Sequence, residues 1–362
     1  MPIRGIVVPL QPFNFPRVMK HFDTDYMEGA HPRVMQRLLE TNLEQTPGYG
    51  NDPYCARAKG LIKEACGCSA DSKELDVHFL VGGTQTNSTV IDALLRHHEG
   101  VLAAETAHIN VHESGAIESC GHKVLTLPSH EGKVDAREVE AYIQNFYADE
   151  TYEHMVAPGM LYISFPTEYG TLYSRAELEE LHRICRQAEI PLYIDGARLG
   201  YGLASEACDF TLSDLPSLCD IFYIGGTKVG ALFGECVVAR QGLLSHFFPL
   251  IKQHGALMAK GRLLGLQFAT LFTDGLYLQA ARHAVSLAMR LKQGFLDKGY
   301  RLFLDSPTNQ QFVVLPNEVM DRLAQTSTFE VWGTRGATHT TVRFVTSWAT
   351  RPEDVEALIH EL

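Results

Sequence analysis

Short apolar segments alternate with amphipathic stretches through the first two thirds of the chain. Seven of these segments are rich in β-branched and aromatic residues without polar alternation, which is typical of strands buried on both faces: 77–81, 101–105, 123–127, 160–165, 191–195, 220–225 and 235–239. Stretches between them at 84–98, 135–147 and 175–188 have helical periodicity, and Ser174 with Glu177 forms a capping-box signature before the last one. The alternation predicts an α/β fold, with a mostly parallel seven-stranded sheet flanked by helices.

The pattern changes after about residue 240. Residues 254–297 are predicted to be almost wholly helical, and the tail combines further apolar segments with a closing helix at 352–362. We therefore expect three parts. Residues 1–40 form an N-terminal segment that packs on the small domain or on a partner subunit, residues 41–250 form the large domain, and residues 251–362 supply connecting helices and a smaller α+β C-terminal domain.

Composition narrows the possible functions. The chain has 362 residues, of which 45% are hydrophobic and 20% charged, so it can bury a large core and form two domains. Its net charge of -12, without a long basic run, argues against binding nucleic acid or an anionic membrane. No signal-peptide or membrane-spanning pattern is found. The eight cysteines are scattered and form no C-x-x-C pair, which disfavours zinc and thioredoxin-like sites and predicts a reducing, cytoplasmic location.

Candidate chemistry follows the ends of the predicted strands, where ligands bind in open α/β sheets. Gly83 and Thr84 follow the first strand and open a helix, which indicates either an anion site or a plain glycine turn with a threonine cap. Asp195 ends another strand, and Arg198 comes three residues later. A buried carboxylate needs a cation, so Asp195 either pairs with Arg198 or faces a bound cationic heterocycle.

Two further strand ends carry histidines and a lysine. His108 and His112 have helical spacing and could share a metal ion, although no third ligand is apparent, and a structural role is the alternative for a single histidine. Lys228 follows Gly225-Gly226-Thr227, where the neighbouring residues predict a buried strand and a tight turn. Desolvation lowers a lysine pKa, and a neutral amine can form a Schiff base. The alternative is that Lys228 only binds a phosphate or forms a salt bridge.

A phosphate cradle, a stacking histidine, a carboxylate for a ring nitrogen and a reactive lysine together fit pyridoxal 5′-phosphate. The chain resembles the fold-type I pyridoxal-phosphate enzymes, and within them the threonine aldolase / aromatic amino acid β-eliminating lyase family. The resemblance runs over nearly the whole chain and is carried by TDYMEGAHP, GYGNDP, GGTQTN, AHINVHESGAIE, PTEYGTLYS, IDGARLGYG, GGTKVGALFGECVV and VRFVTSW. The lysine segment is most similar to bacterial low-specificity L-threonine aldolases.

The resemblance implies roles for individual residues. Those expected to bind the cofactor are Gly83, Thr84 and Gln85 at the phosphate, His108 stacked on the ring, Asp195 at the ring nitrogen, Arg198 near the phenolic oxygen, Lys228 as the covalent attachment, and Lys252 and Lys260 reaching the phosphate from a neighbouring subunit. Those expected to bind the substrate are Thr24, Arg198 and Arg343, with Arg343 clamping its carboxylate. His154 stands where many members carry a second active-site histidine. No metal is implied.

The expected reaction is cleavage of L-threonine, L-allo-threonine or a related β-hydroxy-α-amino acid to glycine and an aldehyde. The base that takes the β-hydroxyl proton is His108, His154 or a water held by them. Phe165-Pro166 replaces an asparagine or glutamine common in relatives, which leaves specificity open. Alternatives are β-elimination, transamination, and a non-catalytic relative that binds the cofactor or a partner. A homodimer or homotetramer, with active sites at the subunit interface, is implied by the resemblance.

Overall fold

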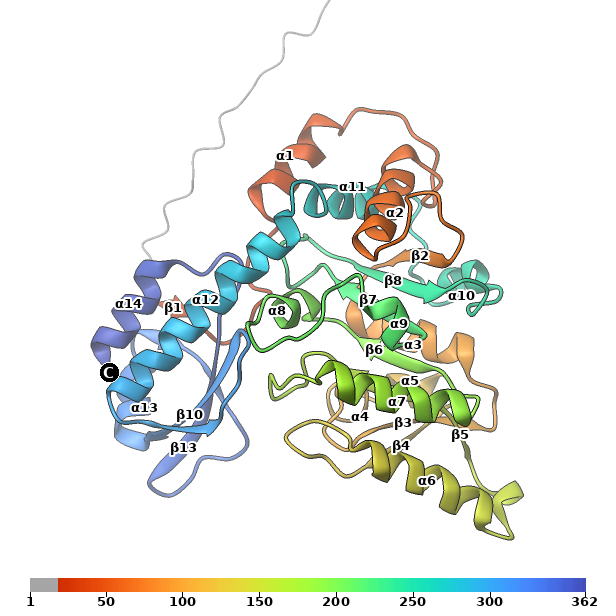
Figure 1. Ribbon diagram of the computed structural model, residues 1–362. Coiled ribbons are helices and arrows are strands. Elements are labelled where there is room, and N and C mark those ends of the chain that lie inside the picture. Colours follow the sequence, from red (N-terminus) through yellow and green to blue (C-terminus); the bar gives the residue numbers. More distant parts are fainter. Residues whose placement is uncertain (1–18) are drawn as a thin grey trace, which may run out of the picture.

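The structure of the protein is a computed structural model that describes residues 19–362. The first part of the predicted N-terminal segment, residues 1–18, lies outside the described residues. Figure 1 shows a large domain built on one sheet and a smaller domain beside it, with α12 (Leu276–Asp297) running from one to the other. None of the described helices is long and apolar enough to cross a bilayer.

The large domain contains the predicted seven-stranded sheet. Its strands are β2 (Leu75–Leu80), β3 (Glu99–Ala104), β4 (Lys123–Leu127), β5 (Ala157–Ser164), β6 (Leu192–Asp195), β7 (Ile221–Gly225) and β8 (Glu235–Arg240). The strand order is β2-β8-β7-β6-β5-β3-β4, and only β8 runs antiparallel to its neighbours. All seven predicted strands are confirmed to within a few residues, as is the mostly parallel arrangement. β6 and β7 are buried along their whole length, which explains why they lack polar alternation.

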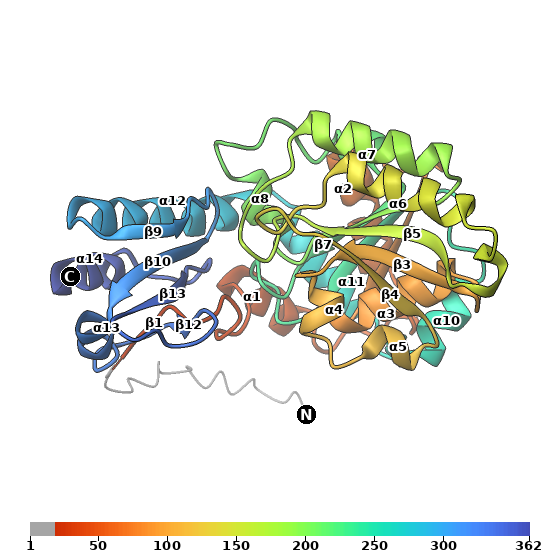
Figure 2. The same ribbon diagram turned by 90° about the horizontal axis from the view of Figure 1, so that it is seen from below.

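Helices cover both faces of this sheet. They are α2 (Pro53–Ala65), α3 (Gly83–Leu94), α4 (His108–Val111), α5 (Ala116–Ser119), α6 (Ala136–Ala148), η1 (Tyr152–His154), α7 (Arg175–Gln187), α8 (Leu199–Leu203), α9 (Leu215–Leu218), α10 (Phe247–Gln253) and α11 (Arg262–Leu271). Figure 2 shows α6 and α7 on one face and α3, α4 and α5 on the other. The predicted capping box opens α7, because Ser174 accepts from the Glu177 amide and Glu177 accepts from the Ser174 amide.

The small domain is an antiparallel sheet covered by helices. Its sheet has the order β12-β13-β10-β9, formed by β9 (Arg301–Leu304), β10 (Gln310–Pro316), β12 (Glu330–Val331) and β13 (His339–Val345). β1 (Lys20–His21) pairs in parallel with β11 (Ser327–Thr328) beside it. The helices are α12, α13 (Asn317–Leu323) and α14 (Pro352–Glu361). Residues 254–261, which the pattern predicts as helix, form a loop between α10 and α11.

The N-terminal segment joins both domains. Phe22 is fully buried in the core of the small domain, whereas α1 (Pro32–Glu40) packs against α11. α11 in turn packs extensively against α2 of the large domain, so the connecting region predicted after residue 250 still contributes to the large domain here. The turn between β1 and α1 therefore passes directly between the two cores, and it brings residues 24–26 to the edge of the large sheet.

Candidate active site

A cavity of about 330 Å³ opens at the carboxyl ends of β5, β6 and β7. This is the edge at which open α/β sheets bind ligands. The cavity brings together six of the twelve predicted site residues, which come from segments far apart in the sequence: Gly83, Thr84, His108, Asp195, Arg198 and Lys228. Further polar side chains line it that the sequence reasoning did not single out: Tyr26, Glu113, Ser164, Glu168, Tyr223 and Glu235.

Lys228 lies on the tight turn between β7 and β8. A Cβ atom on Gly225 would come within 2.2 Å of the Ala197 carbonyl oxygen, and one on Gly226 within 2.6 Å of the Gly234 oxygen, so only glycine fits this close approach. Burial, together with the nearby Arg198 charge, lowers the pKa of Lys228 to about 8. The turn therefore directs into the cavity an amine that loses its proton far more readily than an exposed lysine.

Asp195 is buried at the end of β6, where three donors hold its carboxylate. Oδ2 accepts from Tyr162 Oη at 2.6 Å and from Asn87 Nδ2 at 2.9 Å, and Oδ1 accepts from the Ala197 amide at 2.9 Å. Burial alone would raise the pKa of Asp195, but the His108 charge and the hydrogen bonds outweigh it and hold that pKa below its usual value. The group is thus a fixed anion. Arg198 is not its partner, which excludes the ion pair considered from the sequence.

His108 opens α4 and is held by two acidic residues. Its Nδ1 lies 2.7 Å from Oε1 of Glu113, whose side chain is fully buried, and its backbone amide donates to Oε1 of Glu168 at 2.9 Å. Asn87 donates to the same Glu113 oxygen at 2.8 Å and so links it to Asp195. The imidazole is therefore fixed in orientation, with Nε2 left free of this network.

Arg198 pairs with Asp25, which comes from the turn after β1. Arg198 Nε and Nη2 donate to the two Asp25 oxygens at 2.7 and 2.9 Å, and Asn309 of the small domain donates to Asp25 at 3.0 Å. Although burial opposes it, this pairing holds the pKa of Asp25 below its usual value. A bidentate buried pair of this kind fixes the guanidinium at the cavity wall.

The predicted substrate-carboxylate residues lie next to this pair and carry unused donors. Burial, followed by the Arg198 charge, lowers the pKa of Arg343. Arg343 already contacts Glu330, Gln310 and the face of Trp332, yet its Nε and the hydroxyl of Thr24 are buried without a hydrogen-bond partner among the described residues. Buried polar atoms are rarely left unpaired, so these two indicate a place for a ligand.

Besides Thr24 and Arg343, four other predicted residues do not line the cavity. Gln85 uses its amide to bond the His254 carbonyl at 2.7 Å. His154 is exposed on η1, before the amino end of β5, whereas the cavity opens at the carboxyl end of that strand. Lys252 lies over the Tyr49 ring, 4.6 Å from its centroid, and Lys260 is in the loop before α11. Within one chain, His154 therefore cannot share a substrate with His108.

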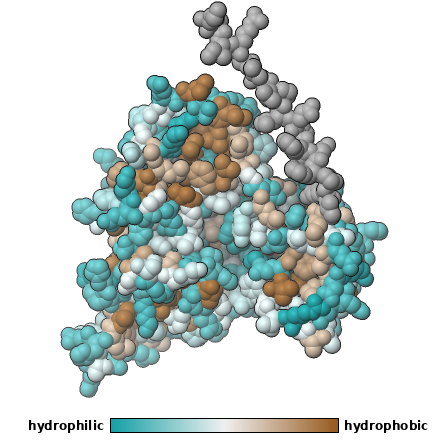
Figure 3. Space-filling model, turned by 180° about the vertical axis from the view of Figure 1, so that it is seen from behind, coloured by the Kyte–Doolittle hydropathy of each residue, from teal (hydrophilic) through white to brown (hydrophobic). Residues whose placement is uncertain are grey.

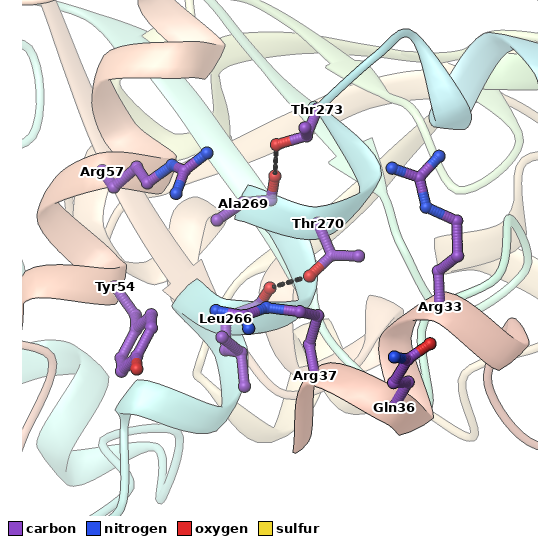
Figure 4. A pocket seen from close by; sticks show the side chains of 9 residues that line it. All are labelled: Arg33, Gln36, Arg37, Tyr54, Arg57, Leu266, Ala269, Thr270 and Thr273. Atoms are coloured by element: carbon purple, nitrogen blue, oxygen red, sulfur yellow. Dashed lines mark hydrogen bonds between the residues drawn. The ribbon is translucent and has the colours of Figure 1, made fainter. Parts of the chain in front are cut away.

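A second hollow lies between α1, α2 and α11, and Figure 4 shows Arg33, Arg37 and Arg57 around it. Arg33 pairs with Asp274 at 2.8 Å and Arg37 with Glu40 at 2.5 Å. The hydroxyls of Thr270 and Thr273 donate to carbonyls of their own helix. The pKa of Tyr54, whose hydroxyl donates to Glu44, is raised by this hydrogen bond, which makes Tyr54 less able to lose its proton. The chemistry therefore belongs to the cavity at the sheet edge.

The cavity residues fit pyridoxal phosphate. The amino end of α3 offers backbone amides to a phosphate, and open space lies beside Gly82, where a Cβ atom would meet nothing within 4 Å. Asp195 is an anion suited to a protonated ring nitrogen, and Lys228 is an amine with a lowered pKa. Among residues 19–362, no group of three or more His, Cys, Asp or Glu is placed to hold a metal ion.

Comparison with known proteins agrees with this geometry. The beta-eliminating lyase family matches residues 21–317. The low specificity L-threonine aldolase of Pseudomonas sp. (strain NCIMB 10558) is 28% identical over 352 residues, 95% of this chain and 96% of that protein. The corresponding aldolase of Saccharomyces cerevisiae is 24% identical over 294 residues, 78% of this chain and 72% of that protein.

Solved structures give the same result. The threonine aldolase of Leishmania major superposes with a TM-score of 0.90 at 39% identity, covering 94% of this chain and 98% of that one. An aspartate aminotransferase of Thermus thermophilus has a TM-score of 0.70 at 15% identity, over 96% of this chain and 91% of that one, which shows the fold alone. The predicted fold-type I architecture is thus confirmed, and the chain belongs to the beta-eliminating lyase family.

Proposed function

We propose that this protein is a pyridoxal-phosphate-dependent carbon–carbon lyase that cleaves L-threonine, L-allo-threonine or a related β-hydroxy-α-amino acid to glycine and an aldehyde. The observation that carries this proposal is that Lys228 and Asp195 line the same cavity. The pKa of Lys228 is lowered to about 8, and the Asp195 carboxylate is held as an anion. The reaction class follows the names of the aldolase relatives, which cover nearly the whole chain.

When bound, the cofactor supplies a protonated pyridine ring that withdraws the electron pair left on the substrate α-carbon when the bond to the β-carbon breaks. Lys228 would hold it through the side-chain amine, and Asp195 would keep the proton on the ring nitrogen. Gly83 and Thr84 would bind its phosphate at the amino end of α3. Thr24, Arg198 and Arg343 would orient the substrate carboxylate.

Replacing Arg343 with leucine tests the carboxylate site. A guanidinium–carboxylate pair in an enclosed site contributes about 1.5–3 kcal/mol, so amino-acid binding should weaken by roughly tenfold to a hundredfold. Cofactor content should stay near that of the parent. The KM values of two or more amino acids would measure the change in substrate binding, and visible absorption would measure the cofactor content. An unchanged KM for every amino acid would place the carboxylate elsewhere.

Glu330 offers a matched variant for this test. It occupies the guanidinium of Arg343, where the substrate carboxylate would also bind. Glu330→Gln removes the competing charge, so we expect KM to fall or stay constant, opposite to the change in Arg343→Leu.

Replacing His108 with phenylalanine separates ring stacking from proton transfer. Phenylalanine keeps a flat ring but removes both nitrogens and the bond to Glu113. If stacking dominates, the variant should hold cofactor and keep substantial cleavage. If the imidazole is the base, cleavage should fall by roughly 10²–10⁴-fold with cofactor retained. His154→Phe is the control, and since that residue is exposed outside the cavity, we expect a parental rate.

A homo-oligomer in the cytoplasm completes the proposal. Figure 3 shows apolar side chains gathered at the end of the molecule where α1 and α2 lie, and exposed large apolar residues in this region include Met27, Met35, Leu39 and Leu43. Such a patch favours a second copy of the chain, from which Lys252 and Lys260 would reach the phosphate. All eight cysteines, each within the described residues, are free thiols, which suits a reducing compartment. Light scattering of the purified protein would measure the mass.

Product analysis tests the function. Purified protein would be incubated with L-threonine, L-allo-threonine and L-phenylserine, and we expect glycine and the matching aldehyde. Cysteine and tyrosine test β-elimination, and a 2-oxo acid as amino acceptor tests transamination. Ammonia without glycine would favour β-elimination over aldol cleavage. Transfer of the amino group to the 2-oxo acid, without glycine, would favour transamination. A visible absorption band that no amino acid changes would favour a non-catalytic relative.

A further inference from the structure

Glu168 is a carboxylate in the cavity for which the site has no other evident use. It follows the end of β5 and lines the same cavity as Lys228. Oε1 accepts from Ser164 Oγ at 2.6 Å and from the His108 amide at 2.9 Å. Both bonds end on the same oxygen, so Oε2 is the atom left to receive a proton from a ligand.

Hydrogen bonds and nearby charges distinguish Glu168 from the other carboxylates at the site. Asp25 is paired with Arg198, Asp195 accepts from three donors, Glu113 binds His108 and Asn87, and Glu235 accepts from the Gly226 amide at 2.9 Å. The pKa values of Asp25 and Asp195 are held low, whereas burial raises the pKa of Glu168, with its hydrogen bond from Ser164 opposing the rise. Burial also raises the pKa of Glu235, to about 7, but Glu235 lies in the field of the Lys228 charge, whereas no cation of the described residues acts strongly on Glu168. A carboxylate without a cation and with a raised pKa is a stronger base than an ordinary one.

The proposed reaction needs one base in addition to the groups that hold the cofactor. The β-hydroxyl must lose its proton as the bond between the α- and β-carbons breaks. His154 lies outside the cavity of its own chain. Nδ1 of His108 is engaged by Glu113, which leaves Nε2 of His108 as the alternative to Glu168. Glu168 lines the same cavity as His108 and accepts a hydrogen bond from the His108 amide through Oε1. Its other oxygen, Oε2, accepts no hydrogen bond from another described residue.

We infer that Glu168 is the catalytic base that takes the β-hydroxyl proton, with Ser164 and the His108 amide as the groups that position it. This inference rests on the proposed aldol cleavage. The O–H electrons become the second bond of the aldehyde C=O, and the electron pair of the broken carbon–carbon bond stays on the α-carbon. That carbon takes up one proton to give glycine, so the proton bound by Glu168 balances the proton gained.

The direct test is Glu168→Gln in the cofactor-loaded enzyme. Glutamine keeps an oxygen that can accept the Ser164 and His108 hydrogen bonds, but it places an NH₂ group where Oε2 stood, so it removes basicity and retains the anchoring. Cleavage of L-threonine should fall by about 10²–10⁴-fold. Exchange of the glycine α-proton in D₂O, followed by NMR, needs no β-hydroxyl base and should stay close to the parental rate. Glu153→Gln, at an exposed position on η1, is the matched control.

The pH profile provides a second readout. A base must be ionised, so kcat/KM of the parent should rise with pH through the raised pKa of Glu168, and this rise should vanish in Glu168→Gln. Ser164→Ala removes a hydrogen bond that lowers the pKa of Glu168, so the same rise should move to higher pH. A purely structural role would move neither profile.

Several results would overturn the inference. A parental rate of cleavage in Glu168→Gln would exclude the role of Glu168 as the base. The same conclusion would follow if the rise of kcat/KM with pH were unchanged in this variant. Loss of glycine exchange together with cleavage would show that Glu168 assembles the site as a whole. If the parent exchanges glycine but cleaves no β-hydroxy amino acid, the proposed function itself fails, and that outcome is separate from failure in the variant alone.

Discussion

Replacing Lys228 with alanine should abolish cleavage and remove the covalent hold on the cofactor. Lys228 is the lysine in the cavity, and burial with the Arg198 charge lowers its pKa to about 8. Loss of one proton-transfer group costs roughly 10²–10⁴-fold, and here the covalent role is lost as well, so cleavage should fall by at least about 10³-fold. Visible absorption and assayed glycine would be measured on the same preparation.

Borohydride reduction of the parent, followed by peptide mapping, gives the positive form of this prediction. The cofactor should be found on the peptide that contains Lys228. Lys252 and Lys260 serve as controls within the chain, because they do not line the cavity of their own subunit. Cofactor trapped on any lysine other than Lys228 would contradict the assignment.

Replacing Asp195 with asparagine should leave part of the cofactor bound but remove most of the activity. An amide carries no charge to balance a protonated ring nitrogen, and loss of one such electrostatic group typically costs about 10²–10³-fold. The structure adds a second cost. Both carboxylate oxygens accept hydrogen bonds, from Tyr162 and Asn87 on one side and from the Ala197 amide on the other. An asparagine NH₂ must therefore face a donor, at about 1–3 kcal/mol.

The two costs can be separated by measurement. Cofactor content and melting temperature report the hydrogen-bond defect, whereas the cleavage rate per bound cofactor reports the lost charge. We expect the rate per bound cofactor to fall in Asp195→Asn. Turnover per cofactor equal to that of the parent would mean that this carboxylate does not face the ring nitrogen.

The central sheet could be predicted because its strands are buried on both faces. Such strands read as continuous apolar segments, and β6 and β7 do so along their whole length. The antiparallel direction of β8 could not be read from its own sequence. It follows from the short tight turn after β7, where the Gly226 and Thr227 amides bond the Gly234 carbonyl. The helix ends in the region 254–297 could not be predicted, because the helical pattern of apolar and polar positions continues through the loop before α11.

The site was predictable only where strand ends carry unusual residues. Asp195 is the last residue of one buried strand, and Lys228 comes three residues after another, and that placement separates them from surface residues. Asp25 and Glu113 have no such local mark. Their roles depend on contacts across the sequence, such as the pairing of Asp25 with Arg198, 173 residues away. The only sequence signal for Glu168 was its place in PTEYG, just after a strand end.

For His154, the expectation from the sequence and its place in the single chain differ. It stands shortly before a strand, and a motif match across the variable loop suggested that it reaches the site. A strand has two ends, however, and η1 precedes the amino end of β5, while Ser164 at the other end lines the cavity. At about 3.3 Å per residue, the eight residues of β5 keep the two ends roughly 25 Å apart.

The most direct test of the account is a mass balance on L-threonine. The cofactor-loaded protein would be incubated with L-threonine and followed by proton NMR, with the Lys228→Ala variant as the blank. We expect threonine to disappear while glycine and acetaldehyde, with its hydrate, appear in equal amounts, and we expect the blank to show neither product. Formation of 2-oxobutanoate and ammonia in place of glycine, or equal product in the blank, would contradict it.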